Sequence, residues 1–511
     1  MIQPRLPLFL LLAFIVSGDA SASYGYYVGK NLTADGSVLI GGTGEEPSSH
    51  WLEIVPRRTH SADATITVGA TAEATLPARL TEIPQVPETF RYLTMNYTSY
   101  AGFPAPLTNG GLNEHQVAIR DIWSPSRQEL VAMTPVGQSG PNYSDLARIA
   151  LERARTAREA VELIGALIDS HGYTTYGGNS HLIADASEGW VVLEFAGGQG
   201  LWVAERLGPD DVRVNYPGYI GDVPADFRER EDWMGSDNLI SFAVAQGWYD
   251  AAGGEPFNAD RVYGLGGTMR HPGLKYLSPK MIEDELRAMA PVTLEAFMAL
   301  VRDPRIADDQ AGYGQVAQLH ENLPHPELAL LWVAPTGSVT APFLPWWIGS
   351  QSVPAEYGQH RYLTEGSGPN FLNADYQLRE ATEFAGRIFK RLMYYTCASP
   401  EAQLERVQGT LSAFEGGILA SLPQLERAAL HAWEAGDADA ARTLLTRESH
   451  ARAAEALTIG RNLVAGIGTE VRLRHGIPPA PAAGGINEGG RTVSCLQGAD
   501  PDRVPPGRRA D

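Results

Sequence analysis

Three blocks of strand-like sequence, with one long helical stretch between the second and the third, constrain the fold of this chain most. The blocks lie at 24–40, 109–123 and 180–207, and each contains aromatic or β-branched runs beside a short turn. The stretch 142–172 has apolar residues at helical spacing. Because strands are followed by helices and then by strands again, this order predicts a layered α+β domain rather than a doubly wound parallel sheet.

The helical stretch carries its own start and stop signals. Asn142 or Ser144 is a suitable N-cap, and Gly172 follows the last turn as a helix stop. Thr156 interrupts the apolar pattern, so one long helix and two helices with a short break are both open.

Further strands are expected in the block 180–207 and again after residue 320. The block 180–207 predicts two apolar strands joined by a turn at 197–198. Residues 327–335 predict another buried strand, and 339–357 form a Pro- and Trp-rich stretch that is typical of a loop.

The last part of the chain is predicted to be mostly helical, from Tyr376 to about Gly466. Ser399 and Pro400 mark the start of one helix, and 435–440 has the composition of a turn between two others. We therefore expect an α+β domain at 23–375, a helical region at 376–475 that packs on it, and a Pro- and Gly-rich tail at 476–511.

The first 22 residues are typical of a secretory signal peptide. Arg5 precedes an apolar run at 7–16, and small residues follow, ending with alanine at position 22. The run is well short of the ~20 residues that a membrane-spanning helix needs, and no later uninterrupted apolar run reaches that length. The sequence therefore predicts an exported protein, periplasmic or extracellular, without integral membrane association.

Composition excludes several classes of function. The 60 acidic residues outnumber the 40 basic ones, which gives a net charge of −20, and no Lys/Arg run is long enough to follow a phosphate backbone. Phosphate-binding loops, dinucleotide fingerprints and His-Glu-x-x-His helices are all missing from the sequence. We therefore expect no nucleic acid partner, no metal and no cofactor.

The two cysteines, Cys397 and Cys495, have no zinc-ligand spacing. In an oxidising compartment they could form one disulfide between the tail and the body, and two thiols are equally compatible with the sequence.

Ser23 is the first candidate for a catalytic residue. A cut after Ala22 leaves Ser23 with an α-amino group, whose ordinary pKa is about 7.7–8.0, next to its own hydroxyl. A nucleophile and a base then share one residue, which is the arrangement of an N-terminal nucleophile. A cut after Ala20 would also fit the small-residue pattern and would leave Ser23 an ordinary internal residue.

Several stretches, taken in their order, resemble a known family. They are "YYVGKNLTADGSVLI", "GGLNEHQVAI", "GNSHLIADASEGWVVLEF" and "LALLWVAP", and they resemble the bacterial dipeptidase and secernin family of N-terminal-nucleophile hydrolases. In that family the nucleophile is a cysteine six residues before the glycine of the "VGK" stretch. Counting back from Gly29 places Ser23 at that position.

The resemblance implies both a fold and an activity. The fold is a four-layer αββα sandwich of antiparallel sheets, here with an additional C-terminal helical region. The activity is hydrolysis of the C–N amide bonds of dipeptides or small peptides, with no metal or cofactor. Serine can replace cysteine in this mechanism because an amine activates a hydroxyl in the threonine members of the class.

One segment departs from the family pattern. After "ADGSVLI" the family places Arg, Asn and an acidic residue, whereas this chain has Gly42 and Thr43, with Glu45 near the acidic position. Glu45 or Glu46 is a candidate contact for the α-amine, and a solvated turn is the alternative for both. The departure predicts a reshaped pocket.

Asn113 and Asn179 are the candidate donors for an oxyanion. Each follows a Gly-rich turn and precedes or opens a strand, so its side chain could face the active cleft. The alternative is that each caps a turn, as Asn often does.

Two further functions remain open from the sequence. One is an acylase or amidase that acts on a non-peptide N-acyl amine, and the other is an inactive binding protein that retains the fold after losing the cysteine. The expected partner is a small peptide or an N-acyl amide, and the oligomeric state is open.

Overall fold

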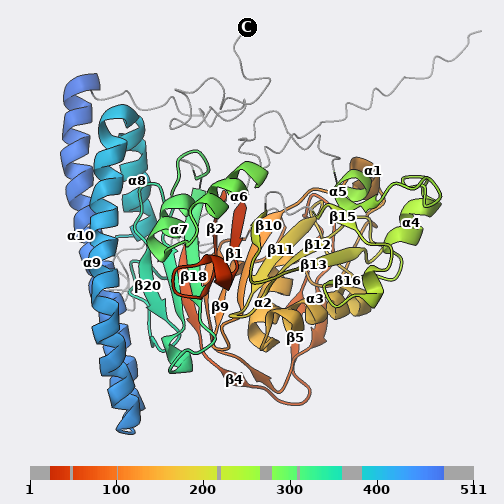
Figure 1. Cartoon of the computed structure of the whole chain (residues 1–511), viewed down its shortest axis with the longest axis horizontal. Coiled ribbons are helices and arrows are strands. Elements are labelled where there is room, and N and C mark those ends of the chain that lie inside the picture. The colour runs from red at the N-terminus through yellow and green to blue at the C-terminus, as the bar shows by residue number, and fades with distance from the viewer. Residues whose placement is uncertain are drawn as a thin grey trace, which may run out of the picture.

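Two antiparallel sheets and three long C-terminal helices dominate the structure (Figure 1). The computed structural model describes residues 23–45, 50–99, 102–215, 220–264, 279–307, 311–359 and 383–476. Every strand pair in both sheets is antiparallel, so the predicted α+β class is confirmed. The predicted signal peptide, Glu46, Cys495 and nearly all of the predicted tail lie outside the described residues.

The first sheet has six strands in the order β14-β1-β2-β18-β19-β20. Its strand β1 is interior, because it pairs with β14 on one side and β2 on the other. The strands are β1 (Tyr24–Val28), β2 (Val38–Glu45), β14 (Val212–Asn215), β18 (Ala311–Leu319), β19 (Leu330–Ala334) and β20 (Leu344–Trp347).

The second sheet has eight strands in the order β16-β13-β12-β11-β10-β9-β8-β3. Its strands are β3 (His50–Val55), β8 (Tyr92–Tyr97), β9 (Leu107–Asn113), β10 (Ala118–Trp123), β11 (Asn179–Ala184), β12 (Gly189–Glu194), β13 (Trp202–Leu207) and β16 (Trp233–Gly235).

Short strands and helices connect these sheets. The short strands are β4 (Arg58–Thr59), β5 (Thr65–Val68), β6 (Thr81–Pro84), β7 (Glu88–Thr89), β15 (Asp222–Val223) and β17 (Phe257–Asn258). The short helices are η1 (Lys30–Leu32), α1 (Gln128–Ala132), η2 (Phe227–Glu229), α4 (Leu239–Ala245), α5 (Ala259–Tyr263) and η3 (Pro326–Leu328).

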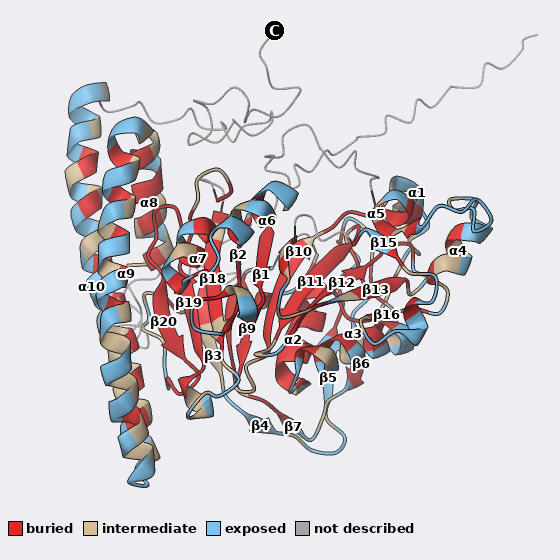
Figure 2. Cartoon of the chain, viewed as in Figure 1, coloured by how far each residue is buried: buried red, intermediate tan, exposed pale blue. Residues whose placement is uncertain are grey.

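The two sheets pack face to face, and helices cover their outer faces. Strand β1 contacts β10 and β11 of the other sheet, and β2 contacts β10. Helices α2 (Tyr143–Arg153) and α3 (Ala157–His171) lie on the eight-stranded sheet, whereas α6 (Pro279–Ala288) and α7 (Leu294–Val301) lie on the six-stranded one. The buried residues are concentrated in the strands and the helix faces turned toward them (Figure 2).

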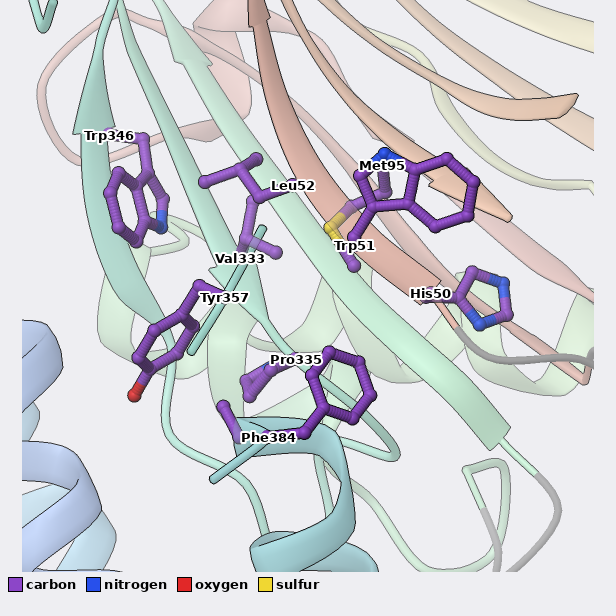
Figure 3. Close-up of a pocket in the computed structure, with 10 residues that line it drawn as sticks. His50, Trp51, Leu52, Met95, Val333, Pro335, Trp346, Tyr357 and Phe384 are labelled. Carbon is purple, nitrogen blue, oxygen red and sulfur yellow. The ribbon is translucent and has the colours of Figure 1, made fainter. Parts of the chain in front are cut away.

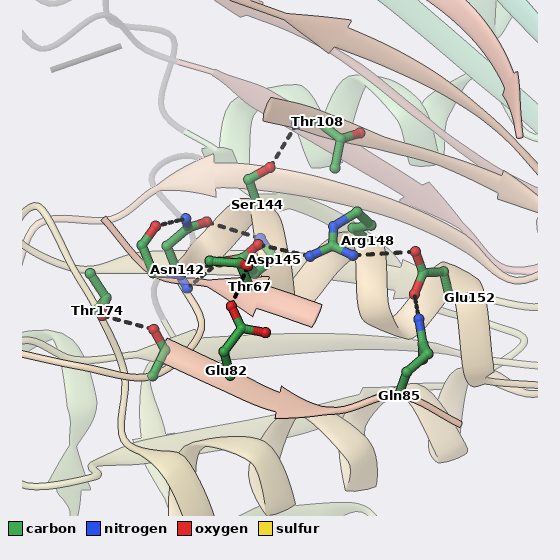
Figure 4. A network of polar contacts seen from close by, with 12 residues as sticks. Thr67, Glu82, Gln85, Thr108, Asn142, Ser144, Asp145, Arg148, Glu152 and Thr174 are labelled. Carbon is green, nitrogen blue, oxygen red and sulfur yellow. Dashed lines mark hydrogen bonds and ion pairs between the residues drawn. The ribbon is translucent and has the colours of Figure 1, made fainter. Parts of the chain in front are cut away.

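The predicted helical stretch forms two helices, because a second cap interrupts it. Asn142 accepts from the backbone N–H of Asp145 at 2.9 Å, and the Asp145 carboxylate accepts from the backbone N–H of Asn142 at 3.1 Å (Figure 4). Thr156 then caps α3 by accepting from the N–H of Glu159 at 3.1 Å. Gly172 ends α3 at a φ of +85°, as predicted for a helix stop.

The C-terminal helices pack on one another and on the edge of the six-stranded sheet. They are α8 (Ala385–Cys397), α9 (Pro400–Glu434) and α10 (Ala438–His475), and α10 contacts β20. Ser399 and Pro400 begin α9 as predicted, and Gly436 lies in the turn before α10 at a φ of +80°. The predicted turn at 435–440 is shorter in the structure, because α10 begins at Ala438.

Two sequence predictions for strands were wrong. The stretch 339–357 was expected to be a loop, but it contains β20, whose Pro345 is tolerated because β20 is an edge strand. The block 180–207 forms three strands rather than two, because a turn at 185–188 separates β11 from β12.

Candidate active site

Ser23 lies at the leading end of β1 and is almost buried, with 7% of its surface exposed. Side chains alternate along a strand, so Ser23 shares a face with Gly25. A Cβ placed on Gly25 would contact Ile122 of β10 and Leu182 of β11. Ser23 is therefore on the face of the six-stranded sheet that packs against the eight-stranded sheet. We call these two opposed faces together the inter-sheet face.

Glycines and amide side chains surround Ser23 on the inter-sheet face. The register places Asn215, Gly25, Gly42 and Gln315 in one row across four strands. Asn215 Nδ2 donates to Ser180 Oγ at 3.3 Å, whereas Asn215 Oδ1 has no partner among the described residues. Both polar atoms of Gln315, which is 1% exposed, also lack a hydrogen-bond partner in the described part of the chain.

The next row contains Ser23, Gly44 and Tyr313. Tyr24 pairs with Thr43, so the register brings Ser23 beside Gly44, which in turn pairs with Tyr313 of β18. A Cβ on Gly44 would lie 2.6 Å from the Tyr313 hydroxyl, so only glycine allows the ring to cover this position. The Tyr313 hydroxyl accepts a hydrogen bond from Arg120 of β10.

Asn113 lies on the other face of the eight-stranded sheet, the helix-facing face that α2 and α3 cover. Its Nδ2 donates to the carbonyls of Leu151 and Ala154 at 3.0 and 2.8 Å, at the C-terminal end of α2. Its Oδ1 accepts from the backbone N–H groups of His115 and Val117, both at 3.0 Å. This geometry corresponds to the turn-capping alternative, and it leaves no amide hydrogen available to an oxyanion.

Asn179 also points away from Ser23. Its Oδ1 accepts from the Tyr176 hydroxyl at 3.2 Å, and its Nδ2 donates to the Ser180 carbonyl at 3.1 Å. The neighbouring Ser180 has the opposite orientation and shares a hydrogen bond with Asn215 on the inter-sheet face. The structure therefore does not bring Asn113 or Asn179 together with Ser23, whereas the register places Asn215 of β14 in the row next to Ser23.

The acidic candidates near Ser23 fall at the limit of the described residues. Glu45 ends β2 and pairs with Ala311, and its side chain lies outside the described residues, as does the whole of Glu46. Thr43 is buried, and its hydroxyl donates to the Tyr313 carbonyl at 2.8 Å, which ties β2 to β18 beside the site.

A buried ion pair lies on the helix-facing face behind the site. His181 Nδ1 is 2.6 Å from Glu194 Oε1, and Nε2 is 3.0 Å from the carbonyl oxygen of Tyr143. Burial lowers the pKa of His181, but Glu194, Asp121 and the Tyr143 carbonyl together raise it above its usual value, while burial also raises the pKa of Glu194. Both ring nitrogens face acceptors, which is the environment of an imidazolium.

An apolar cavity has His50 of β3 in its lining (Figure 3). It encloses about 240 Å³ of space outside the protein atoms, part of which is open to solvent. The His50 ring lines this cavity and also contacts Tyr313, with 5.2 Å between the two ring centroids. The lining residues are His50, Trp51, Leu52, Met95, Val333, Pro335, Trp346, Tyr357, Phe384 and Ala385.

The described residues contain no group of three or more His, Cys, Asp or Glu side chains that is placed to hold a metal ion. None of the helices in the described ranges combines the length and the apolar character that are needed to cross a membrane.

Comparison with known families identifies the chain. The model of peptidase family C69 matches residues 25–280, which is half of the chain. The chain belongs to peptidase family C69. The resemblance to the dipeptidase family that the sequence indicated is thus confirmed at the level of the family.

The C69 chain is similar to probable dipeptidases of Streptococcus pyogenes. A probable dipeptidase B of serotype M3 (strain ATCC BAA-595 / MGAS315) is 28% identical over 240 residues, which cover 46% of this chain and 45% of that protein. A probable dipeptidase A of serotype M1 is 32% identical over 154 residues, which cover 29% of this chain and 31% of that protein. This chain therefore spans about half the length, or less, of these relatives.

Among solved structures, a mutant conjugated bile acid hydrolase from Clostridium perfringens aligns with 65% of this C69 chain and 93% of its own. The sequence identity is 11% and the TM-score is 0.31. A TM-score at this level is too low to support a conclusion about fold or chemistry.

Proposed function

We propose that this chain is an exported peptidase that cleaves the C–N amide bond of dipeptides or small peptides, with Ser23 as its N-terminal nucleophile. Membership of family C69 supports the class of reaction. The observation that carries the proposal is the position of Ser23, almost buried at the leading end of an interior strand and beside unpartnered amide groups.

The proposed mechanism uses two groups of one residue, the α-amine and the side-chain hydroxyl of Ser23. After the leader is removed, the α-amine of Ser23 accepts the proton of the Ser23 hydroxyl, and the oxygen attacks the substrate carbonyl. The N–H of Asn215 Nδ2 that is not donated to Ser180 Oγ stabilises the oxyanion, and Asn215 lies diagonally across from Ser23 on the inter-sheet face. The ammonium then protonates the leaving amine, and the same amine activates the water that hydrolyses the acyl-enzyme.

The arrangement of layers supports the same proposal. Helices α2 and α3 pack on the eight-stranded sheet, and that sheet packs on the six-stranded sheet. Helices α6 and α7 cover the other face of the six-stranded sheet. We propose that this arrangement is the four-layer αββα sandwich of N-terminal-nucleophile hydrolases. The nucleophile then lies between the two central sheets.

A second candidate is hydrolysis of a non-peptide N-acyl amine. The observation that favours it is the segment where the family places Arg and Asn but this chain has Gly42 and Thr43. Comparison of dipeptides with N-acyl amines of similar size as substrates separates the two candidates.

The test combines N-terminal sequencing with turnover. The full chain is expressed with its leader, and we expect the exported protein to begin at Ser23. It should hydrolyse dipeptides, Ser23→Ala should lose all turnover, and Ser23→Cys should retain it. The control is Ser187→Ala, which removes an exposed hydroxyl and should leave turnover unchanged.

Two results would contradict the mechanism. One is a mature protein that begins at Ser21 or keeps its leader, and the other is full turnover in Ser23→Ala. A correctly processed wild-type protein that binds dipeptides and releases no product would instead support an inactive binding protein.

A further inference from the structure

Arg120 is a buried cation without an acidic partner in the described part of the chain. It is 2% exposed, and it forms no ion pair there. Its Nη1 donates to the Asn109 carbonyl at 3.1 Å and its Nη2 donates to the Tyr313 hydroxyl, whereas its Nε has no partner. By contrast, the similarly buried Arg302 forms a two-pronged ion pair with Glu415.

The adjacent acidic residue, Asp121, forms no ion pair with Arg120 in the described part of the chain. Asp121 follows it on β10, so its side chain lies on the helix-facing face, where it accepts from Asn109 Nδ2 at 3.5 Å. Burial raises the pKa of the Asp121 carboxyl above its usual value, and the Arg120 charge opposes this rise only in part. A buried guanidinium that lacks a paired carboxylate is costly unless an anion binds it.

The guanidinium of Arg120 lies beside Ser23. The guanidinium carbon of Arg120 is 4.5 Å from the centroid of the Tyr313 ring. Arg120 also contacts the Tyr313 hydroxyl, which would lie 2.6 Å from a Cβ placed on Gly44. Directly opposite residues on neighbouring strands have Cβ atoms about 4.5–5.5 Å apart, and Ser23 is the neighbour of Gly44. Ser23 and Arg120 can therefore contact opposite ends of one small substrate.

We infer that Arg120 binds the free carboxylate of the substrate, at the residue that follows the scissile amide. In a dipeptide only the amide nitrogen and one α-carbon separate the scissile carbonyl from that carboxylate. A carboxylate matches the fork of a guanidinium and can use the unpartnered Nε together with Nη2. Gln315, two residues from Tyr313 on the same face, offers a further donor and acceptor to the substrate main chain.

This inference rests on the proposed function and narrows its substrate class. Free dipeptides bind through both ends of the site, whereas dipeptide amides and N-acyl amines without a carboxylate leave Arg120 unpaired. Arg120 is then a specificity-determining residue rather than a nucleophile or a base.

The test measures binding without turnover, in the Ser23→Ala background of the exported protein. Isothermal titration calorimetry compares alanyl-phenylalanine with alanyl-phenylalanine amide, which differ only in the carboxylate. We expect the free acid to bind about 10- to 100-fold more tightly than the amide, since hydrogen bonds to charged groups are the stronger class. Arg120→Gln should remove this preference, and Arg120→Lys should retain part of it.

Two further variants separate binding from folding. Tyr313→Phe keeps the charge but removes the hydroxyl that orients it, and should reduce the preference several-fold. Arg302→Gln is the matched control, because it also removes a buried guanidinium and should lower the melting temperature without changing the ratio of the two affinities. Near-UV circular dichroism checks that each variant is folded.

The inference is overturned if the parent protein binds acid and amide equally, or binds neither, or if the preference survives in folded Arg120→Gln. Failure of the proposed function has a different signature. If only the proposed function is wrong, the wild-type protein binds the free acid more tightly than the amide but hydrolyses neither ligand.

Discussion

Two buried polar side chains near Ser23, between the sheets, differ from two on the helix-facing face of the eight-stranded sheet in how their atoms are hydrogen-bonded, although Glu194 Oε2 on the helix-facing face also lacks a partner among the described residues. On the helix-facing face, every side-chain nitrogen and oxygen of His181 and Asn113 has a hydrogen-bond partner. On the inter-sheet face near Ser23, Arg120 Nε and Asn215 Oδ1 have none within the described residues, and Arg120 has no acidic partner there either.

The difference separates structural polar groups from binding groups. A buried polar group without a partner costs about 1–3 kcal/mol, so a fold that keeps several of them in one place does so against its own stability. Partnered groups stabilise the fold. Unpartnered groups are available to a ligand, and the following predictions test this division.

The largest expected effect is on turnover, from Asn215→Ala on the inter-sheet face. Removal of one oxyanion donor should lower kcat by about 10²–10³-fold. The free energy of unfolding should change by less than about 1 kcal/mol, because the only side-chain hydrogen bond lost is the 3.3 Å contact with Ser180. Steady-state kinetics and urea unfolding check both. Unchanged kcat would remove Asn215 from the mechanism.

Asn113→Ala on the helix-facing face should have the reverse profile. It leaves the carbonyls of Leu151 and Ala154 and two backbone N–H groups without partners, so the free energy of unfolding should fall by about 2–4 kcal/mol. The kcat of the folded fraction should not change. If kcat falls as far as in Asn215→Ala while stability is retained, the division between the two faces is wrong.

The ion pair of His181 should make stability depend on pH. Its pKa is raised in the folded state, so its contribution is fully present below the unfolded-state pKa of about 6.5 and is lost as pH rises through the folded-state pKa. His181→Gln cannot protonate and should lose about 1.5–3 kcal/mol at pH 6 and less at pH 9. Urea unfolding across this range measures the difference, and an equal loss at both pH values would argue against a charged pair.

The smallest expected effect is a gain. Gln315→Leu replaces two unpartnered buried polar atoms by apolar ones of similar volume, so the free energy of unfolding should rise by about 1 kcal/mol. Affinity for a dipeptide should fall at the same time. A loss of stability would show that the Gln315 amide is structurally partnered.

Local sequence signals predicted much of the fold. The cap at Asn142, one of two candidates, the break at Thr156, the helix stop at Gly172 and the Ser399-Pro400 helix start all depend on neighbouring residues. That Thr156 itself caps α3 was not predicted. Strand β20 was missed because its two tryptophans and Pro345 have no alternating pattern, and only its edge position explains them.

The site was less accessible to the sequence because it depends on which face of a strand meets the other sheet. Asn179 and Ser180 are adjacent, and a one-residue difference in register decides which of them points toward Ser23. Arg120 did leave a signal, since it is a charged residue within the apolar strand "AIRDIW". Asn215 ends β14 and Gln315 lies in β18, and only the pairing of strands distant in sequence places them near Ser23.

The burial of Ser23 sets an order of events for maturation under the proposed function. Proteases cut accessible, extended chain, whereas Ser23 is 7% exposed and opens a strand that is paired on both sides. The bond before Ser23 therefore has to be cut before β14 and β2 close around β1. Removal of the leader then precedes folding, and slow processing would delay assembly of the whole six-stranded sheet.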